Sequence, residues 1–542
     1  MTLFFDLFDY LALILRAFAL IAQTVTLGSV AFLCLIAQRL QADGIAGADT
    51  VQRGAVRILR IAGSAIAVFA LLRVALQVAG LVGTGIPLDR ALGAGSVIAW
   101  SLQAACGAAL AVRARRVDAS TLVFALAVLA CGIATSHAAG RIEDRGWLLA
   151  ATVLHQAGAA VWIGGLPALL VALATVTDRR ALAFVGRRYS AMALAGVVAL
   201  LTGAGFFAVK YIGSGAAMYG TAYGFMTGAK VALFLMLAFL GAGNFFLVRR
   251  LNRDPATPIF RFRRFVEAEL GLALAALAAA ASLTSVPPAV DLTADRVTWE
   301  EIAERNWPPR PAWTSPAHDQ LAISKLRDEL ESRGADERAL AFVPGSGVRV
   351  TYNEADKLWS QFNHNWAGVF LLIGALLALG THAGLRWARN WPLVFIGLAV
   401  FLFLRSDADA WPAGDIGFWE SFRDPEILQH RALLPLIVAI GWFERNVQTG
   451  RYDVRPSGYV FPLLCLLGGL VLLTHSHTLD DTREVLLIEM SHSIMALLAL
   501  ATGAARWLEL RSEDLGVRRV AAWIWPIGLA LIGVVLIGYR EM

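Results

Sequence analysis

The sequence has few charged residues and few cysteines for its length. Only 16% of its 542 residues are Asp, Glu, Lys or Arg, whereas soluble domains contain about a quarter. The four cysteines, Cys34, Cys106, Cys131 and Cys465, lie inside apolar runs without CxxC spacing, so they predict neither a disulfide framework nor a thiolate metal site. The sequence also lacks a GxxxxGK[ST] stretch, which argues against a pump driven by a P-loop ATPase.

Long apolar runs fill the chain instead. Apolar residues make up 58% of it, and runs of about 20 residues, enough to cross a bilayer as a helix, recur from end to end. The sequence therefore predicts an all-α, polytopic helical membrane protein embedded in the lipid bilayer. About fourteen spans are expected, at residues 9–37, 57–79, 91–112, 119–136, 147–174, 187–210, 223–249, 265–286, 364–386, 390–405, 428–446, 457–475, 484–506 and 519–539.

The orientation of the spans follows from the charges in the loops. Arginines gather after every odd-numbered predicted span, as at Arg39, Arg113 and Arg249, and basic loops stay in the cytoplasm. Both termini are therefore expected outside, in the periplasm of a Gram-negative cell. The N-terminus lacks a basic region and a small-residue cleavage site, so we expect a retained first helix rather than a signal peptide. The net charge of +6 lies in short loops and does not indicate nucleic-acid binding.

One long polar stretch, residues 287–362, is expected on the outside. It separates an eight-span half, residues 1–286, from a six-span half, residues 363–542. The sequence LRDELESRGADERAL (326–340) is typical of an amphipathic helix. Two interpretations of this external segment stay open, a lid or partner-docking element and a surface linker. His318 within it is expected to be solvated.

Histidines gather at the outer ends of the predicted spans. Of the nine in the chain, only His382 is expected toward the cytoplasm. Grouped neutral imidazoles suit copper, zinc or haem iron. The candidate metal ligands are His137, His155, His364, His430, His475, His477, His492 and Glu489.

The stretch 472–507 carries the strongest part of this pattern. His475 and His477 end one span, and Glu489 and His492 lie three residues apart in the next, on one helix face. Ionisable groups this close to an apolar span usually mark function. An acidic turn between the two spans supplies carboxylates that either orient the imidazoles or bind the metal directly; it contains Asp480 and Asp481.

Two of the candidates have specific structural alternatives. His155 also fits the role of an interhelical hydrogen-bond donor. His364 also fits an aromatic belt beside Trp366. No elbow serine or pair of catalytic carboxylates accompanies the histidines, so we do not expect an enzyme.

Several motifs resemble the copper-resistance D (CopD/PcoD) family of bacterial inner-membrane proteins. RRYSAMALAGVVALLTGAGFF (187–207) and YGFMTGAKVALFLMLAFLGAGNFFLVRRL (223–251) resemble its core domain, about residues 185–285 here, and LHQAGAAVWIGGLPAL (154–169) resembles its His…Trp-Ile-Gly-Gly helix. FNHNWAG, GFWESFRDPEILQHR, LLTHSHTLDD and SHSIMALLALATGAARWLELR are similar to motifs of its longer members. Those members often have two consecutive histidines where this chain has His364 and Asn365, which makes position 365 a doubtful ligand.

The resemblance implies copper handling at the inner membrane, commonly described as uptake from a periplasmic copper-binding partner. The first hypothesis is thus a transporter that captures periplasmic copper at the outer histidines and passes it into the cytoplasm. The second is a membrane protein binding haem b, with His155 or His430 facing His492. The third is an assembly factor that delivers copper through the 287–362 segment. The sequence carries no prediction of oligomeric state.

Overall fold

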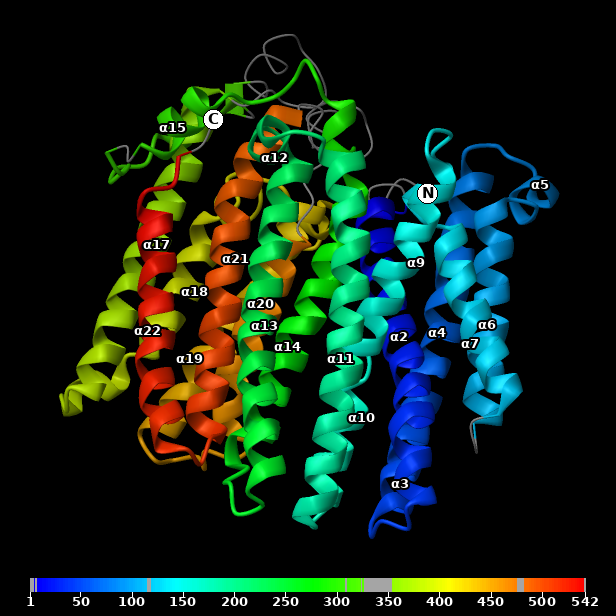
Figure 1. Cartoon of the computed structure of the whole chain (residues 1–542). Coiled ribbons are helices and arrows are strands. Elements are labelled where there is room, and N and C mark those ends of the chain that lie inside the picture. The colour runs from blue at the N-terminus through cyan, green and yellow to red at the C-terminus, as the bar shows by residue number, and fades with distance from the viewer. Residues whose placement is uncertain are drawn as a thin grey trace. The chain divides into compact units, whose positions relative to one another are not determined.

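The protein consists of long apolar helices (Figure 1). The computed structural model describes Phe4 and residues 7–114, 118–307, 310–322, 324–325, 353–474 and 482–540. In these residues β-structure is limited to an isolated bridge between Ala410 and Ile416. The predicted class, a polytopic helical membrane protein, is confirmed.

The described helices match the predicted spans one for one. Eleven are long and apolar enough to cross a membrane: Phe8–Ala42, Ala48–Gly83, Gly95–Arg113, Arg145–Thr175, Arg179–Ile212, Ala222–Arg253, Phe260–Asp291, Glu354–His382, Ile427–Gln448, Leu486–Arg511 and Leu515–Ile537. Three shorter apolar helices, Ala119–Ala134, Leu393–Arg405 and Ser457–Leu473, account for the others.

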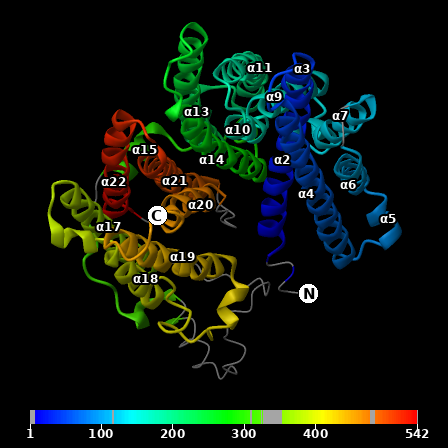
Figure 2. The ribbon, with the colours of Figure 1, turned by 90° about the horizontal axis from the view of Figure 1, so that it is seen from below.

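The chain folds into two compact units. Unit 2 comprises residues 11–294 and 512–514, and unit 1 comprises residues 1–10, 295–511 and 515–542. The boundary at residue 294 lies within the predicted external segment. Figure 2 shows the helices of each unit nearly end-on.

Unit 2 contains the N-terminal helices. They are α2 (Phe8–Phe32), α3 (Gln38–Ala42), α4 (Ala48–Gly83), α5 (Leu88–Leu92), α6 (Gly95–Arg113), α7 (Ala119–Ala134), α8 (His137–Gly140), α9 (Arg145–Trp162), α10 (Leu166–Thr175), α11 (Arg179–Phe207), α12 (Gly215–Gly220), α13 (Ala222–Arg253) and α14 (Phe260–Ser282). Helix α4 packs along α6, α9 along α11, and α13 along α14.

The Trp-Ile-Gly-Gly sequence forms the joint between α9 and α10, and there the backbone of α2 passes very close. A Cβ atom on Gly164 would lie 1.9 Å from the carbonyl oxygen of Thr24, and one on Gly28 would lie 2.1 Å from the carbonyl carbon of Gly164. Neither position has room for a side chain. Small residues allow such close backbone approach between membrane helices, so these glycines fix the position of α9.

Replacing Gly164 with valine is expected to destabilise the protein by about 3 kcal/mol, because the new side chain must push α2 away from the joint. The measurement is the thermal unfolding midpoint in detergent. Gly146→Ala is the control, since nothing lies within 4 Å of a Cβ atom at that position near the start of α9. Equal midpoints for the two variants would show that the joint tolerates a side chain.

Unit 1 contains the C-terminal helices. They are α15 (Trp299–Asn306), α17 (Glu354–His382), α18 (Leu393–Arg405), α19 (Pro425–Gln448), α20 (Val460–Leu473), α21 (Thr482–Arg511) and α22 (Leu515–Ile537). Its core is aromatic: Trp525 packs against Trp391 and Phe461 with ring centroids 5.4 Å apart in both pairs.

Helix α17 begins well before the predicted span, inside the segment expected to be a loop. Its start is fixed by a capping box: the side chain of Asn353 accepts hydrogen bonds from the amides of Ala355 and Asp356, and the Asp356 carboxylate accepts one from the amide of Asn353 at 2.7 Å. Such reciprocal capping satisfies otherwise unpaired amides at a helix start. The predicted amphipathic helix 326–340 lies outside the described residues.

Candidate functional site

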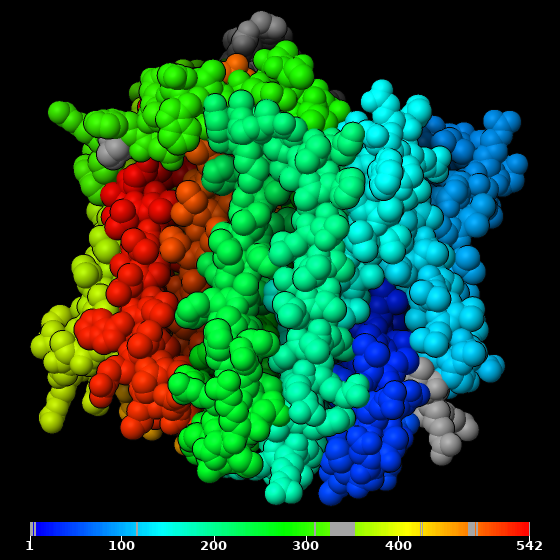
Figure 3. All heavy atoms as spheres, viewed as in Figure 1, coloured from blue at the N-terminus to red at the C-terminus, as the bar shows by residue number. Residues whose placement is uncertain are grey.

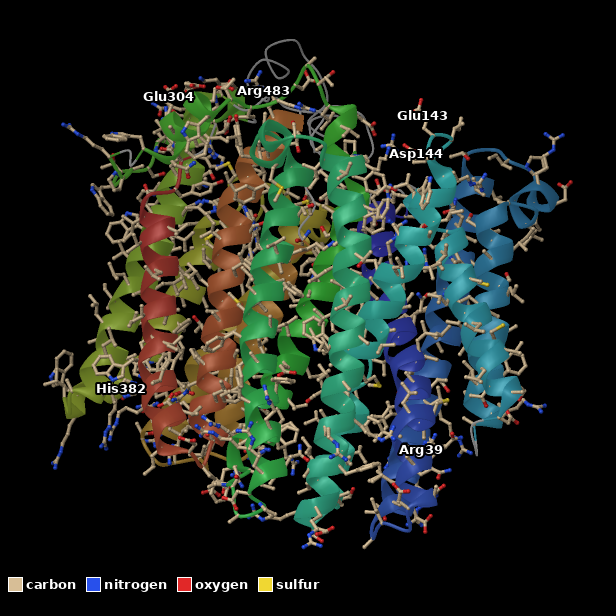
Figure 4. The ribbon with its side chains drawn as sticks, viewed as in Figure 1. Arg39, Glu143, Asp144, Glu304, His382 and Arg483 are labelled. Carbon is tan, nitrogen blue, oxygen red and sulfur yellow. The ribbon has the colours of Figure 1, made fainter. Side chains whose placement is uncertain are left out.

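The described candidate ligands of unit 1 share one end of its helices. Helices α17, α19 and α21 begin at this end, and α18 and α22 finish there, as the hydrogen bond from Asn363 to the carbonyl of Arg405 shows. We call it the histidine end, because His364, His430 and His492 lie within about three turns of the starts of their helices. Figure 4 shows His382 at the opposite end of unit 1 from Glu304 and Arg483.

His430 on α19 is held by a carboxylate. Its Nδ1 lies 2.7 Å from Oδ1 of Asp407, in the segment directly after α18. The Asp407 side chain is only 6% exposed, whereas that of His430 is 36% exposed. With Nδ1–H donated to the carboxylate, the neutral ring carries its lone pair on Nε2, the arrangement found around metal-binding histidines. The sequence prediction missed Asp407; its signal was the acidic SDAD stretch at a span end.

The residue after His430 anchors the same segment to α19. Arg431 is buried; it donates a hydrogen bond to the carbonyl of Trp411, and its guanidinium lies 5.1 Å from the ring centroid of Phe403. The connection that carries Asp407 is therefore fixed to α19 by a second contact, which keeps the carboxylate beside the imidazole.

His364 on α17 is oriented by its own helix and by an aromatic ring. Its Nδ1 lies 2.9 Å from the carbonyl oxygen of Ser360, and its ring stacks on Tyr539 with centroids 3.9 Å apart. The neighbouring Asn365 is buried and donates to the carbonyls of Leu536 and Ile537 at 3.1 and 3.0 Å. Asn365 thus ties α17 to α22, a structural role that agrees with its doubtful standing as a ligand.

Glu489 and His492 lie on α21. The Nδ1 of His492 is 2.9 Å from the carbonyl oxygen of Ile488, so its lone pair also falls on Nε2. Glu489 is only 6% exposed, and its carboxylate lies 3.4 Å from the hydroxyl of Ser493. A carboxylate buried in a membrane-spanning helix is energetically costly and usually functional.

The structure does not by itself assemble a complete metal centre. Within the described residues, no three His, Cys, Asp or Glu side chains are close enough to hold one metal ion. His475, His477, Asp480 and Asp481 lie outside the part of the chain that the structure describes. The predicted cluster that combines His475 and His477 with the other histidines therefore stays a prediction.

The expectation that His318 is solvated is wrong. Its Nε2 lies 2.9 Å from the carbonyl oxygen of Ala408, and its Nδ1 lies 3.1 Å from the hydroxyl of Ser324. The ring also meets the edge of Trp359, with centroids 6.1 Å apart. Both ring nitrogens are used in protein contacts, so His318 fastens the polar segment to the residue that follows Asp407.

In unit 2, His155 takes the interhelical role named as its alternative. Its Nδ1 lies 3.1 Å from the carbonyl oxygen of Leu200, which joins α9 to α11, and its ring meets Phe207 edge-on at 5.4 Å. Lys230 on α13 is near enough for its charge to act on His155. That ammonium disfavours a metal cation at the imidazole, so His155 is a weaker candidate than the histidines of unit 1.

Three helices of unit 2 enclose polar side chains that the sequence prediction missed. Asn244 on α13 donates a hydrogen bond of 2.7 Å to Glu269 on α14, and Glu269 is only 3% exposed. Tyr189 on α11, close enough to feel the charge of Glu269, donates a bond of 2.5 Å to the carbonyl of Trp162. Figure 2 shows α14 set back from α11 and α13, and Figure 3 shows α11 and α13 on the face of unit 2 toward the viewer. The available signals were Asn244 in LGAGNFF and the two glutamates, Glu267 and Glu269, in FVEAELGLAL.

His137 lies at one end of unit 2, in the short helix α8. Its Nε2 lies 2.8 Å from the carbonyl oxygen of Thr284. Burial lowers the pKa of His137, and Arg16 and Arg141 lower it further, while the Thr284 carbonyl acts in the opposite direction. Two guanidinium groups near the imidazole repel any metal cation, so the surroundings argue against His137 as a copper ligand.

Two units of apolar helices with ionisable side chains inside them define a polytopic membrane protein with candidate ion-binding groups. Residues 183–283, most of α11 and all of α13 and α14, match the family model described as Copper resistance protein D. The predicted resemblance to the copper-resistance D family is therefore confirmed over this region of the chain. Tyr189, Asn244 and Glu269 all lie in the matched region.

A relative from Bacillus subtilis (strain 168), the copper transport protein CutJ, is 32% identical to this chain over 172 residues. The match covers 31% of this chain and 30% of the relative's length. No solved structure matches the chain.

Proposed function

We propose that this protein handles copper at a bacterial inner membrane, capturing the ion at the histidine end of unit 1 and passing it toward the cytoplasm. The observation that supports this most directly is the match of residues 183–283 to the Copper resistance protein D model. The name of the B. subtilis relative, a copper transport protein, agrees with a role in transport.

The capture step uses the described histidines of the histidine end together with His475 and His477, because no three described side chains alone are close enough to hold one ion. In His364, His430 and His492, Nδ1 faces a carbonyl or carboxylate oxygen at 2.7–2.9 Å. In a neutral ring this contact places the proton on Nδ1 and the lone pair on Nε2, and the neutral imidazole is the form that binds copper. Asp407 also makes the imidazole of His430 more basic, which strengthens it as a ligand. His475 and His477 add further imidazoles in this proposal.

The inward step uses the polar interior of the family domain. Glu269 lies nine residues into α14, or about 14 Å along the helix at 1.5 Å per residue. An ionised carboxylate at that depth offers a cation a favourable position inside an apolar bundle. Asn244 holds this carboxylate in place through its hydrogen bond.

The partner in this proposal is a periplasmic copper-binding protein that delivers the ion to the histidine end. We propose no catalysed reaction: the protein moves copper and does not transform a substrate.

Accumulation of radioactive copper in cells that produce the protein tests the proposal. Cells with the wild-type chain are expected to take up copper several-fold faster than cells with an empty vector, and cells with His430→Ala plus His492→Ala are expected to match the vector. Production of all variants in the membrane is checked by immunoblot. Unchanged copper uptake together with a Soret band in the purified wild-type protein would contradict the proposal and favour the haem hypothesis.

A further inference from the structure

A pocket of about 440 Å³ opens at the end of unit 2 where α2 begins and α7 and α14 finish. Its lining includes Arg16, His137, Arg141 and Asp291. The volume lies in the range of small-ligand sites. The proposed copper path does not use this pocket.

The charge of the pocket is positive. Arg141 and Asp291 form a two-pronged ion pair and largely neutralise each other. Arg16 donates a hydrogen bond to the hydroxyl of Thr284, and it forms no ion pair with any carboxylate in the described part of unit 2. The uncompensated charge of Arg16 therefore makes the net charge of the pocket positive.

A second arginine, for which the described residues provide no carboxylate partner, adds to the positive potential at this end of unit 2. Arg73 on α4 is close enough to Arg16 for the two charges to repel, and its guanidinium lies 3.9 Å from the ring centroid of Trp100. Repulsion between two cations in membrane-spanning helices is costly and indicates that a negative partner completes the site.

The depth of Arg16 indicates the kind of anion. Arg16 follows Phe8, the first residue of α2, by eight positions, or about 12 Å along the helix. Arg141 lies beyond the membrane-spanning helices, between α8 and α9. The guanidinium of Arg16, near the membrane interface, suits a tetrahedral anion, because one guanidinium forms two parallel hydrogen bonds with phosphate oxygens.

We propose that this pocket binds an anionic phosphate group, with Arg16 as its principal partner. Thr284 and Thr135 supply hydroxyls nearby, and the neutral imidazole of His137 borders the site. The group belongs either to the headgroup of an anionic phospholipid or to a free phosphate from the aqueous phase. Copper is disfavoured there by the same charges.

Binding of phosphatidylglycerol and of inorganic phosphate to the delipidated full-length protein tests this site. Native mass spectrometry counts retained lipid, and the thermal unfolding midpoint reports binding of either probe. Arg16→Gln is expected to weaken binding at least tenfold, and Arg16→Lys to weaken it less, because the charge is kept. Arg90→Gln is the matched control: Arg90 is an exposed arginine at the same end of unit 2 and lies outside the pocket lining.

If the wild type binds phosphatidylglycerol but not inorganic phosphate, and Arg16→Gln loses that binding, the pocket is a lipid site. If the wild type binds inorganic phosphate as well as it binds phosphatidylglycerol, the pocket is a site for the free ion. The proposal is overturned if neither probe binds the wild type, or if Arg16→Gln binds both as well as Arg90→Gln does. The unfolding midpoints without any probe, compared between Arg16→Lys and Arg16→Gln, separate loss of binding from loss of folding.

Discussion

Replacing Asp407 with asparagine is expected to weaken copper binding at the histidine end by about 10- to 100-fold, the usual effect of losing a carboxylate behind a metal-binding histidine. The amide oxygen of asparagine still accepts the hydrogen bond from Nδ1 of His430, so the ring keeps its position. What is lost is the negative charge, which makes the imidazole more basic and balances the bound cation. Competition of the purified protein with a copper chelator measures the change.

Asp319→Asn is the control for this variant, because Asp319 is an exposed aspartate of the same unit that forms no hydrogen bond or ion pair with the described candidate ligands. His430→Ala is expected to lose at least as much affinity as Asp407→Asn, since it removes the ligand itself. Wild-type affinity in Asp407→Asn would show that His430 does not bind the ion.

Replacing Glu269 with glutamine is expected to slow copper passage roughly tenfold or more while copper capture stays intact, since a buried charge along the path acts strongly in a low-dielectric interior. Glutamine keeps an oxygen that accepts the 2.7 Å hydrogen bond from Asn244, so packing between α13 and α14 is preserved. Uptake of radioactive copper into proteoliposomes measures passage, and chelator competition measures capture.

Glu267→Gln is the matched control for Glu269→Gln. Glu267 lies two residues earlier on the same helix, and its carboxylate pairs with Arg263 and Arg264 rather than with Asn244. Both variants replace one carboxyl group of α14 with an amide. A similar loss of uptake in the two would contradict a specific role for Glu269.

The number and class of the helices were predictable because they depend on runs of apolar residues. A helix that crosses the lipid interior must be apolar along its whole length, so the composition of about 20 consecutive residues is enough to recognise a span. Helix ends were less predictable: α17 begins at Glu354, ten residues before the predicted span, because the capping groups of Asn353 and Asp356 act locally and carry no hydrophobic signal.

The candidate site was predictable in its histidines and not in their partners. Asp407 contacts His430 across 23 positions of sequence, and Asn244 contacts Glu269 across 25. Such pairs arise from helix packing, which a single sequence does not reveal. The predicted topology also placed His137 among the candidate ligands, whereas in the folded unit it is close enough to Arg16 and Arg141 for their charges to act on it, which disfavours a cation there.

Metal content of the purified protein tests the central claim most directly. After production in copper-supplemented cells and removal of loosely bound metal, elemental analysis of the wild type is expected to find copper, and the visible spectrum no Soret band. The double variant His430→Ala with His492→Ala is expected to retain less than a tenth of that copper while folding normally. Equal copper in both proteins, or haem in place of copper in the wild type, would contradict the assignment of the histidine end as the place where copper is captured.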